Sequence, residues 1–527
     1  MSATPLSTYV EARAAEMNGD EARSARLFAA LAAANPSDST IARRAISAAI
    51  QSGQNGLALD LARKIDPKQL PLDARLLLTA DALRRGKTGE AITTMERGDT
   101  PTETDLFGPL LRAWDHTARA RMDGVTALAT QGVQGPLGSI AEEHRAAMLF
   151  ALRRPDEALP IAQKVVARGG GRSSRLRVAY ADALIRAKRV EQAQAMLAGS
   201  DATLIAARNR LIARRPLNAA IDTPSKGFAE LLVALAVDIS RDESKSLPIA
   251  LVQVARHASP DNYEPTLLLA LLLDGDSRPD DALAALRTIP ADALLAGDAL
   301  DLEAKLLSDT KRRDEALRRA HAAVQSRQAT SADYRRLGNV LGEMERHSEA
   351  ASAYAQAIQR SGAEGQSDEL WTLHLLRAAS LEQAGNWSEA KAALETAMRI
   401  EPDNAVLLNF LGYGKLERGE DLDAAEAMIR KASALRPNDA SITDSLGWAL
   451  YKRGRLPEAV ETLTRAAAGD PTQGEIHEHL GDALFASGRR IEARFSWEAA
   501  LLVSEEKAKA RLRQKIALGL DRATAAP

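Results

Sequence analysis

Small and apolar residues recur along this chain with helical spacing, in pairs of segments joined by short polar turns. Near the C-terminus the arrangement returns after 34 residues, because Gly447 is followed by Ala459 and Gly481 by Ala493. Pro471 follows the second segment of the first of these copies. Proline cannot continue a helix, and glycine readily forms a left-handed cap at a helix end. The pattern therefore predicts pairs of helices that repeat and stack.

The same spacing continues upstream, with a small residue in the first helix and alanine in the second. Both must be small because the two helices of a pair cross there. The step from Gly338 to Ala378 is 40 residues, so residues 361–367 are predicted to form a widened loop. The earlier pairs of positions are Gly412/Ala425, Ala378/Ala390, Gly338/Ala350, Ala304/Ala316 and Ala270/Ala282. Weaker copies place the second-helix alanine at Ala193, Ala158, Ala91, Ala58 and Ala22.

A 34-residue unit with Leu-Gly in one helix, alanine in the next and proline at its exit is typical of the tetratricopeptide repeat. We therefore predict an all-α fold, a tetratricopeptide-repeat α-solenoid whose helix–turn–helix repeats wind into a right-handed superhelix. Each repeat of a solenoid contacts only its neighbours, so a chain of 527 residues need not divide into globular domains.

The regularity of the repeats predicts the organisation of the chain. Residues 1–198 are expected to form a degenerate N-terminal array, in which residues 98–140 hold one helical pair at best. Residues 228–504 are expected to form a second array with its best repeats at 371–504. Residues 199–227 contain Pro216 and Pro224 and are predicted to be an irregular junction or hinge. Residues 505–520 are predicted to be a capping helix with a polar outer face, and residues 521–527 a disordered tail.

Composition excludes several functions. The formal net charge is −2, from 69 basic and 71 acidic residues, so the chain lacks the basic excess of a nucleic-acid or membrane-surface protein. There is no cysteine, which excludes disulfides, thiolate metal sites and cysteine nucleophiles. The longest apolar runs, Leu231–Val237 and Leu267–Leu273, are far shorter than the roughly 20 residues of a transmembrane helix. The first residues lack a basic start followed by an apolar run, so no signal peptide is expected in the chain as given.

Three local motifs resemble ligand sites without the required context. Gly86-Lys87-Thr88 lacks the upstream glycine and strand of a phosphate-binding loop, and Gly169-Gly170-Gly171 follows no strand. His477 and His479 are two residues apart, so they point to nearly opposite sides of a helix, whereas zinc-binding histidines on one helix are four apart. We therefore predict no cofactor, no metal and no enzymatic activity.

The first helices of successive tetratricopeptide repeats usually line the concave wall of the superhelix. Family positions 2, 5, 9, 12 and 13 would face this groove. Aromatic anchors beside polar groups are typical of peptide-binding surfaces, and the acidic residues would favour Lys or Arg in a ligand. The predicted groove residues are Asn409, Tyr413, Glu417, Asp444, Trp448, Tyr451, Lys452, Glu478, Asp482 and Phe485.

Two alternatives concern this groove. Trp448 and Tyr451 could pack between neighbouring first helices instead, since position 4, usually tryptophan, is Thr443 here. Capture of a chaperone C-terminal carboxylate is not favoured. Arg335 and Asn339 fit that pattern loosely, but the positions that follow are Leu376, Val406 and Phe410, which cannot hold a carboxylate.

The repeats carry further shared residues, at Leu411-Gly412-Tyr413, Asp444-Ser445-Leu446-Gly447-Trp448 and Ile476–Asp482, with Asp81–Gly86 and Pro109–Trp114 upstream. These segments resemble bacterial, specifically α-proteobacterial, tetratricopeptide adaptors of carboxyl-terminal processing proteases. The resemblance extends over nearly the whole chain and is most specific in residues 405–500. It implies a scaffold that holds an envelope protease and presents substrates such as cell-wall hydrolases.

The leading hypothesis is a non-catalytic scaffold or adaptor that binds proteins or peptides in its groove. One rival is a metal-dependent enzyme built on the superhelix, with His479 and Asp482 as ligands, and another is a purely structural helical array. The adaptors that the chain resembles are lipoproteins with a signal peptide and a lipidated cysteine, which this sequence lacks. The expected compartment is therefore cytoplasmic for the chain as given, or periplasmic and outer-membrane-associated if its N-terminus is truncated.

Overall fold

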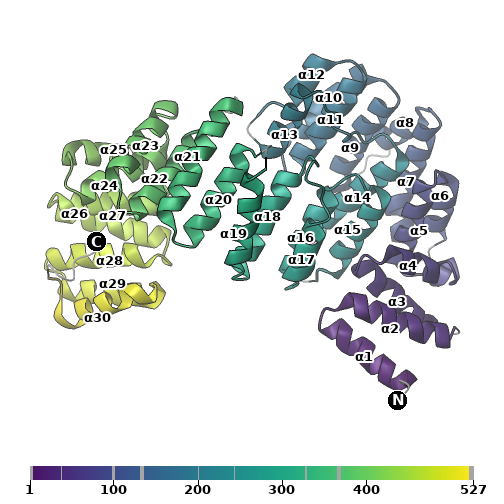
Figure 1. The fold of residues 1–527 in the computed structure, drawn as a ribbon, viewed down its shortest axis with the longest axis horizontal. Helices are drawn as coiled ribbons and strands as arrows, with labels where there is room; N and C mark the ends of the chain where they lie inside the picture. The colour runs from purple at the N-terminus through teal and green to yellow at the C-terminus, as the bar shows by residue number, and fades with distance from the viewer. Residues whose placement is uncertain are drawn as a thin grey trace. The chain divides into compact units, whose positions relative to one another are not determined.

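The computed structural model describes residues 4–36, 38–97, 101–130, 136–199, 201–241, 244–326, 329–364 and 370–521. In these ranges all regular structure is helical, with thirty α-helices, one short 3-10 helix and no strand. The chain divides into two compact units, residues 1–312 and 313–527 (Figure 1). No helix in the described ranges has the length and apolar character needed to cross a membrane.

In the first unit most helices pack against the next helix along the chain. The helices of this unit are α1 (Pro5–Met17), α2 (Glu21–Ala34), α3 (Ser39–Gln51), α4 (Asn55–Ala62), η1 (Pro67–Gln69), α5 (Leu72–Arg84), α6 (Thr88–Glu96), α7 (Pro101–Ala118), α8 (Asp123–Thr130), α9 (Pro136–Ala151), α10 (Pro155–Ala167), α11 (Ser173–Arg186), α12 (Val190–Met196), α13 (Ala202–Ile212), α14 (Pro224–Ile239), α15 (Ser246–Ala258), α16 (Glu264–Gly275), α17 (Pro279–Leu286) and α18 (Ala296–Asp309). However, α13 packs against α11 and α18.

The second unit holds the most regular repeats. Its helices are α19 (Arg313–Val324), α20 (Ser331–Glu343), α21 (His347–Glu364), α22 (Leu370–Gln383), α23 (Trp387–Ile400), α24 (Ala405–Glu417), α25 (Leu422–Leu435), α26 (Ala440–Lys452), α27 (Leu456–Gly469), α28 (Gly474–Ala486), α29 (Arg490–Val503) and α30 (Glu506–Leu518). Each even-numbered helix from α20 to α28 packs against the helix that follows it, and each pair packs against the next.

The close crossing of paired helices explains why the repeat positions carry small residues. A β-carbon on Gly447 would lie 2.5 Å from Leu463 Cγ, and one on Gly481 would lie 2.4 Å from the Trp497 ring. These distances are too short for a side chain, so glycine is required where α26 crosses α27 and α28 crosses α29. The turns of the four pairs from α22 to α29 contain a glycine with positive φ, such as Gly454 with φ 74°, whereas Glu345 takes this conformation between α20 and α21.

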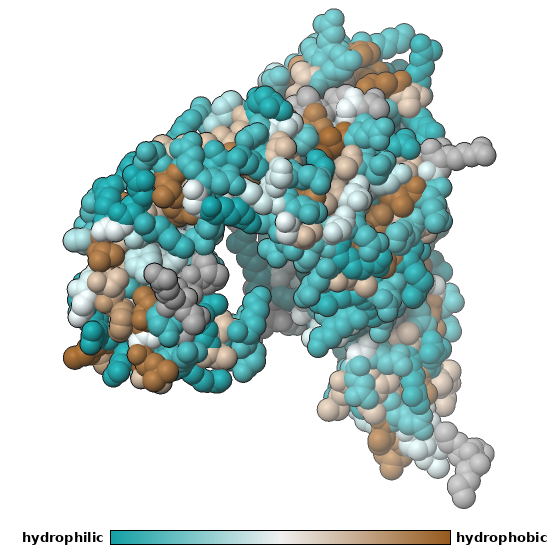
Figure 2. Space-filling view, turned by 60° about the vertical axis from the view of Figure 1, so that its left-hand side comes forward, coloured by the Kyte–Doolittle hydropathy of each residue, from teal (hydrophilic) through white to brown (hydrophobic). Residues whose placement is uncertain are grey.

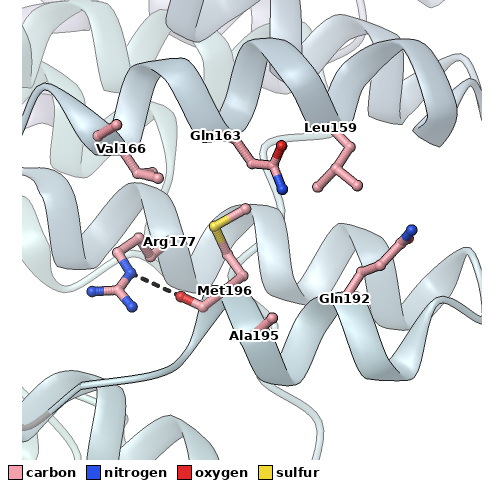
Figure 3. A pocket seen from close by; sticks show the side chains of 8 residues that line it. Leu159, Gln163, Val166, Arg177, Gln192, Ala195 and Met196 are labelled. Carbon is pink, nitrogen blue, oxygen red and sulfur yellow. Dashed lines mark hydrogen bonds between the residues drawn. The ribbon is translucent and has the colours of Figure 1, made fainter.

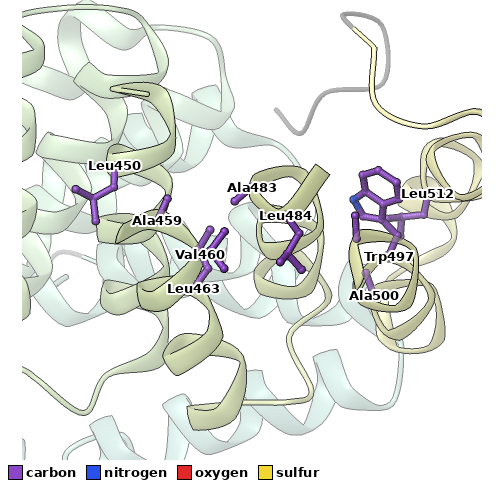
Figure 4. Packing of buried hydrophobic residues seen from close by; sticks show 10 residues of the cluster. Leu450, Ala459, Val460, Leu463, Ala483, Leu484, Trp497, Ala500 and Leu512 are labelled. Carbon is purple, nitrogen blue, oxygen red and sulfur yellow. The ribbon is translucent and has the colours of Figure 1, made fainter. Parts of the chain in front are cut away.

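The prediction that proline follows the second helix of a repeat, made for Pro471, is confirmed there and holds at two earlier repeats as well. α23, α25 and α27 each end two residues before Pro402, Pro437 and Pro471. Beyond α29, the chain adds α30 in the segment where the capping helix is predicted. Leu512 of α30 is fully buried and extends the cluster formed by Leu463, Ala483 and Trp497 (Figure 4).

The stretch predicted to be irregular, residues 199–227, contains a helix. Asp201 caps α13 by accepting hydrogen bonds from the backbone N–H groups of Thr203 and Leu204. Thr223 caps α14, and Pro224 occupies its first turn. Proline is tolerated there because the backbone N–H groups of the first turn have no acceptor within the helix. Among the described residues of this stretch, 213–223 form the longest segment without a regular helix, and Pro216 lies within it, whereas Pro224 begins α14.

The boundary between the two compact units lies at a different place from the boundary between the two predicted arrays. α14 and α15 pack against α3, α5 and α7. These contacts join residues 224–258 to the N-terminal helices. Gly227 permits this contact, because a β-carbon there would lie 2.3 Å from the Trp114 ring of α7. Phe107 and Phe228 meet edge to face at 6.3 Å. The units therefore separate after Arg312, far from residues 199–227.

Three smaller predictions concern irregular segments. Residues 98–140 hold the pair α7 and α8 and the start of α9. Residues 361–364 of the predicted wide loop belong to α21, so the additional residues partly lengthen a helix. The rest of that loop, residues 365–367, lies outside the described residues. So do residues 522–527 of the predicted tail.

Candidate functional site

The ten predicted groove residues lie on three first helices, α24, α26 and α28. α26 contacts both α24 and α28, so the structure does bring these helices together. Asn404 and Asp439 cap α24 and α26 through their side-chain oxygens, which fixes where each helix begins. We call the surface formed by α24, α26 and α28 the first-helix wall.

Trp448 is the centre of the wall but is not an exposed anchor. Its side chain is 1% exposed and lies between the rings of Tyr451, 4.7 Å away, and His479, 4.1 Å away, both nearly parallel to it. Its indole Nε1 donates a hydrogen bond to Glu417 at 2.7 Å, and Lys452 Nζ lies 5.0 Å from the ring centre. The alternative in which Trp448 fills the space between first helices is the observed one.

Asp444 and His479 form a buried pair between α26 and α28. The His479 ring is fully buried, and its Nδ1 lies 2.9 Å and 3.1 Å from the two carboxylate oxygens of Asp444. Burial disfavours the charged ring, but attraction to Asp444 and the hydrogen bond outweigh this and raise the pKa of His479 above 6.5. Stacking on Trp448 adds a cation–π attraction for the protonated ring.

The raised pKa predicts a pH dependence of stability. A group whose pKa is higher in the folded state stabilises that state fully below its unfolded pKa, about 6.5 for histidine, and the stabilisation is lost as pH rises through the folded pKa. We therefore expect the C-terminal unit to unfold at lower urea concentration at about pH 8.5 than at about pH 6. His479→Gln should flatten this dependence, while His477→Gln, on the same helix, should retain it. Equal slopes for both variants would contradict the assignment.

Glu478 and Asp482 are also buried, and basic residues of α30 neutralise them. Lys515 Nζ lies 2.7 Å from Glu478 Oε1 and 2.7 Å and 2.8 Å from the oxygens of Asp482. Arg511 donates two hydrogen bonds of 2.8 Å to Glu478, and Trp497 Nε1 donates to Asp482 at 2.9 Å. Although burial opposes it, these hydrogen bonds lower the pKa of Glu478. The two carboxylates therefore hold the capping helix, and they do not face a ligand as predicted.

A rule of pairing connects consecutive layers of the wall. The fifth residue of α26, Asp444, binds the sixth residue of α28, His479, and the fifth residue of α28, Glu478, binds the sixth residue of α30, Arg511. Sequence reasoning missed this pairing, because a step of 34 residues from His479 reaches Arg513, whereas α30 begins 32 residues after α28 and places Arg511 opposite Glu478. The basic residues of the predicted capping helix were the available signal for a partner of Glu478.

The remaining predicted residues are more accessible. Lys452 is exposed, and Asn409, Tyr413, Glu417, Tyr451 and Phe485 are half-buried. Burial raises the pKa of the phenol groups of Tyr413 and Tyr451, so both remain neutral donors at physiological pH. Phe485 packs toward the end of α30, where a β-carbon on Gly519 would lie 2.8 Å from its ring. The wall therefore offers partly covered aromatic edges beside one exposed cation.

The geometry does not favour the metal-enzyme alternative. His479 and Asp482 are each held by other partners, Asp444 and Lys515. Across the described residues, no group of three or more potential protein ligands is arranged to hold a metal ion. The weaker motifs are turns: Gly86, Gly169 and Gly170 have positive φ between helices. Asn339, considered for carboxylate capture, accepts a hydrogen bond of 2.8 Å from the Tyr354 hydroxyl.

The first unit holds a buried ion cluster that sequence reasoning missed. Glu230 is 3% exposed and accepts hydrogen bonds from Arg175 at 2.5 Å, from Asn262 at 3.2 Å and from Arg172. Glu264 lies 3.5 Å from both arginines. The sequence did contain a signal of a buried charge, because Glu230 is the one charged residue between positions 227 and 237 in an otherwise apolar segment. Buried charges require such partners, so the cluster joins α11, α14 and α16.

The first unit has two surface pockets near α11. One of about 710 Å³ lies beside the ion cluster and is lined by residues from α11, α13, α14 and the segments before α16 and α18. Another of about 280 Å³ lies against α10, α11 and α12 (Figure 3). There Arg177 donates a hydrogen bond of 2.8 Å to the backbone oxygen of Met196, so its guanidinium supports the chain. Neither pocket brings together a recognisable catalytic set.

Family models of the tetratricopeptide repeat match residues 149–203, 415–474 and 445–511. Together with the helical pairs, these matches define the protein class: an all-α tetratricopeptide-repeat solenoid. Proteins of this class bind other proteins or peptides. No curated protein matches the chain.

Solved structures of similar proteins have low sequence identity to the chain. The Cut9 and Hcn1 complex of the APC/C is 14% identical, covers 98% of this chain and 96% of the other, and has a TM-score of 0.38. A tetratricopeptide repeat protein from Parabacteroides merdae is 14% identical, with coverages of 49% and 99% and a TM-score of 0.40. YrrB, described as a tetratricopeptide protein with an unusual peptide-binding site, is 19% identical, with coverages of 37% and 97% and a TM-score of 0.28.

Proposed function

We propose that this chain is a non-catalytic scaffold that binds partner proteins through the first-helix wall. The observation that carries the proposal is the row of half-buried aromatic residues on three adjacent first helices, Tyr413, Tyr451 and Phe485, beside the exposed Lys452. Aromatic side chains that are already partly ordered give large contact area at low entropic cost, and they are frequent hot spots of interfaces.

The charges of the wall favour a different ligand from that expected from sequence. Asp444, Glu478 and Asp482 are neutralised within the unit, so they do not select Lys or Arg in a partner. The exposed ammonium group of Lys452 lies 3.5 Å from Glu417. We therefore infer that the wall takes an extended segment with apolar or aromatic side chains and uses Lys452 for a carboxylate or backbone carbonyl.

For the identity of the partner, we propose a carboxyl-terminal processing protease, with envelope proteins as the substrates presented to it. This finer proposal rests on the sequence resemblance of residues 405–500 to the adaptors of such proteases. In that role the wall would hold the protease or its substrate and would not take part in peptide-bond cleavage.

Binding of the purified processing protease of the same organism to the full chain tests both levels of the proposal. We expect Tyr451→Ala combined with Lys452→Glu to weaken binding by about tenfold or more, as at interface hot spots. Lys452→Glu alone keeps the three stacked rings but removes the ammonium group beside Trp448 and Glu417, so its thermal unfolding is compared with that of the wild type. The matched control is Glu461→Ala combined with Arg465→Ala, two exposed residues of α27.

The outcomes separate the two levels. If the protease does not bind, capture of partners from lysate by the wild type but not by the wall variant retains the scaffold proposal and rejects the protease. If both variants bind every partner as the wild type does, the first-helix wall is not the binding surface. Binding is measured by biolayer interferometry, with thermal unfolding of each variant to confirm that it is folded.

A further inference from the structure

Helix α29 exposes an apolar stripe on its outer face. Ile491, Phe495 and Leu502 are 74%, 67% and 85% exposed. With Glu498, they follow one another at intervals of four, three and four residues, which places all four on one face of the helix. Hydrophobic residues gather at the lower left of the molecular surface, where the C-terminal helices lie (Figures 1 and 2).

The stripe distinguishes this repeat from the one before it. The equivalent positions of α27, 34 residues earlier, are exposed and are occupied by Pro457, Glu461, Thr464 and Ala468. A terminal repeat normally presents a polar outer surface for solubility. Three large apolar side chains at the end of the array therefore indicate a surface that is covered in solution.

The spacing of the stripe is the same when it is read in either direction. If a second α29 runs antiparallel about a two-fold axis between residues 496 and 497, Ile491 of one copy lies opposite Leu502 of the other. Phe495 then lies opposite Glu498, whose methylene groups can cover the ring while its carboxylate remains at the edge. Such an isologous contact satisfies the requirement that one surface be complementary to itself.

The charges at the edge of the stripe match under the same rotation. Arg494 and Glu498 are both exposed, and they form no ion pair with each other in the described structure. In the antiparallel pair, Arg494 of each copy lies within about one residue rise, ~1.5 Å along the axis, of Glu498 of the other, on the same side of the contact. Two identical ion pairs therefore form, one on each side of the two-fold axis.

We propose that α29 is a self-association surface, and that its occupant is α29 of a second copy of this chain. One pair of helices buries less than the roughly 1,200–2,000 Å² of a stable interface. The dimer is therefore weak, and its population rises with protein concentration. A scaffold that pairs in this way carries two first-helix walls, so partners with two or more binding segments gain avidity.

The decisive experiment uses charge reversal in the full chain. Arg494→Glu alone and Glu498→Arg alone each place like charges opposite one another twice, so each variant is expected to run as a monomer of 56.5 kDa. An equimolar mixture of the two variants restores both ion pairs and is expected to return to twice that mass. The measurement is light scattering after size exclusion at about 50 µM protein, a range suited to weak interfaces.

The controls separate this surface from others. Phe495→Glu should abolish dimerisation, and Leu435→Glu, at an exposed leucine of α25, should leave it intact. A monomeric wild type at this concentration would overturn the proposal, as would a dimer that survives Phe495→Glu. Failure of the mixture to restore the dimer would overturn the antiparallel arrangement.

Discussion

Replacing Lys515 with methionine is expected to lower the free energy of unfolding of the C-terminal unit by about 3–5 kcal/mol. The Lys515 side chain is fully buried, and its ammonium group contacts both Glu478 and Asp482. Methionine has a similar length and keeps most of the packing, so the loss comes from removing the ammonium group that neutralises Glu478 and Asp482, of which Glu478 keeps its contact with Arg511. Urea denaturation followed by circular dichroism measures the loss, and hydrogen exchange should place it in α28–α30.

Two further variants test this cause. Adding Asp482→Asn to Lys515→Met removes the buried negative charge that Lys515 neutralises in the wild type and should recover part of the lost stability. Lys507→Met, at an 87% exposed lysine of the same helix, should change stability by less than about 0.5 kcal/mol. A loss in Lys515→Met no larger than in Lys507→Met would contradict the central place of Lys515 in the capping contact.

The second large effect is expected for Trp448→Ala, with a loss of about 3–5 kcal/mol, as for other buried aromatic residues. The substitution removes the ring between Tyr451 and His479 and leaves a cavity where α24, α26 and α28 meet. It also removes the indole donor of Glu417. The same denaturation experiment measures the loss, and hydrogen exchange should increase in all three helices.

A graded series separates packing from hydrogen bonding. Trp448→Phe keeps an aromatic ring in the stack and loses the indole donor, so about 1–2 kcal/mol is expected. Trp387→Ala provides a matched control, because that indole also donates to a glutamate, Glu420, but is only half-buried. If Trp387→Ala costs as much as Trp448→Ala, burial within the wall is not the source of the effect.

The repeat architecture could be predicted because its cause is local and periodic. Gly447 and Gly481 are required by helix crossings within their own pairs, and Pro402, Pro437 and Pro471 stop helices of their own repeats. Each requirement acts within a few dozen residues, so it leaves a visible spacing in the sequence. The helix–turn–helix order and the position of α30 follow from such signals.

The exposure of the wall could not be predicted in the same way, because it depends on neighbouring layers. Asp444 and Glu478 occupy positions that face a groove in the family pattern, yet each is covered by a base from the next first helix. Likewise, the contact of α14 and α15 with α3, α5 and α7 depends on shape over long separations in sequence. In the structure, Gly227 allows the close approach of α14 to Trp114 of α7. In the sequence alone, a single glycine near Pro224 instead indicates a loop.

The pairing of a fifth-position acid with a sixth-position base also affects how such an array can change in length during evolution. Loss of the 32-residue segment from Gly474 to Glu505, which ends just before α30, would bring Arg511 to the place of His479, opposite Asp444, and the charges would still match. Insertion of another copy of that segment would preserve the match as well. Glu478 of the first copy would then lie opposite His479 of the second, and Glu478 of the second copy would lie opposite Arg511. Recombination between repeats can therefore shorten or lengthen this end of the protein, provided that α30 remains as its terminus.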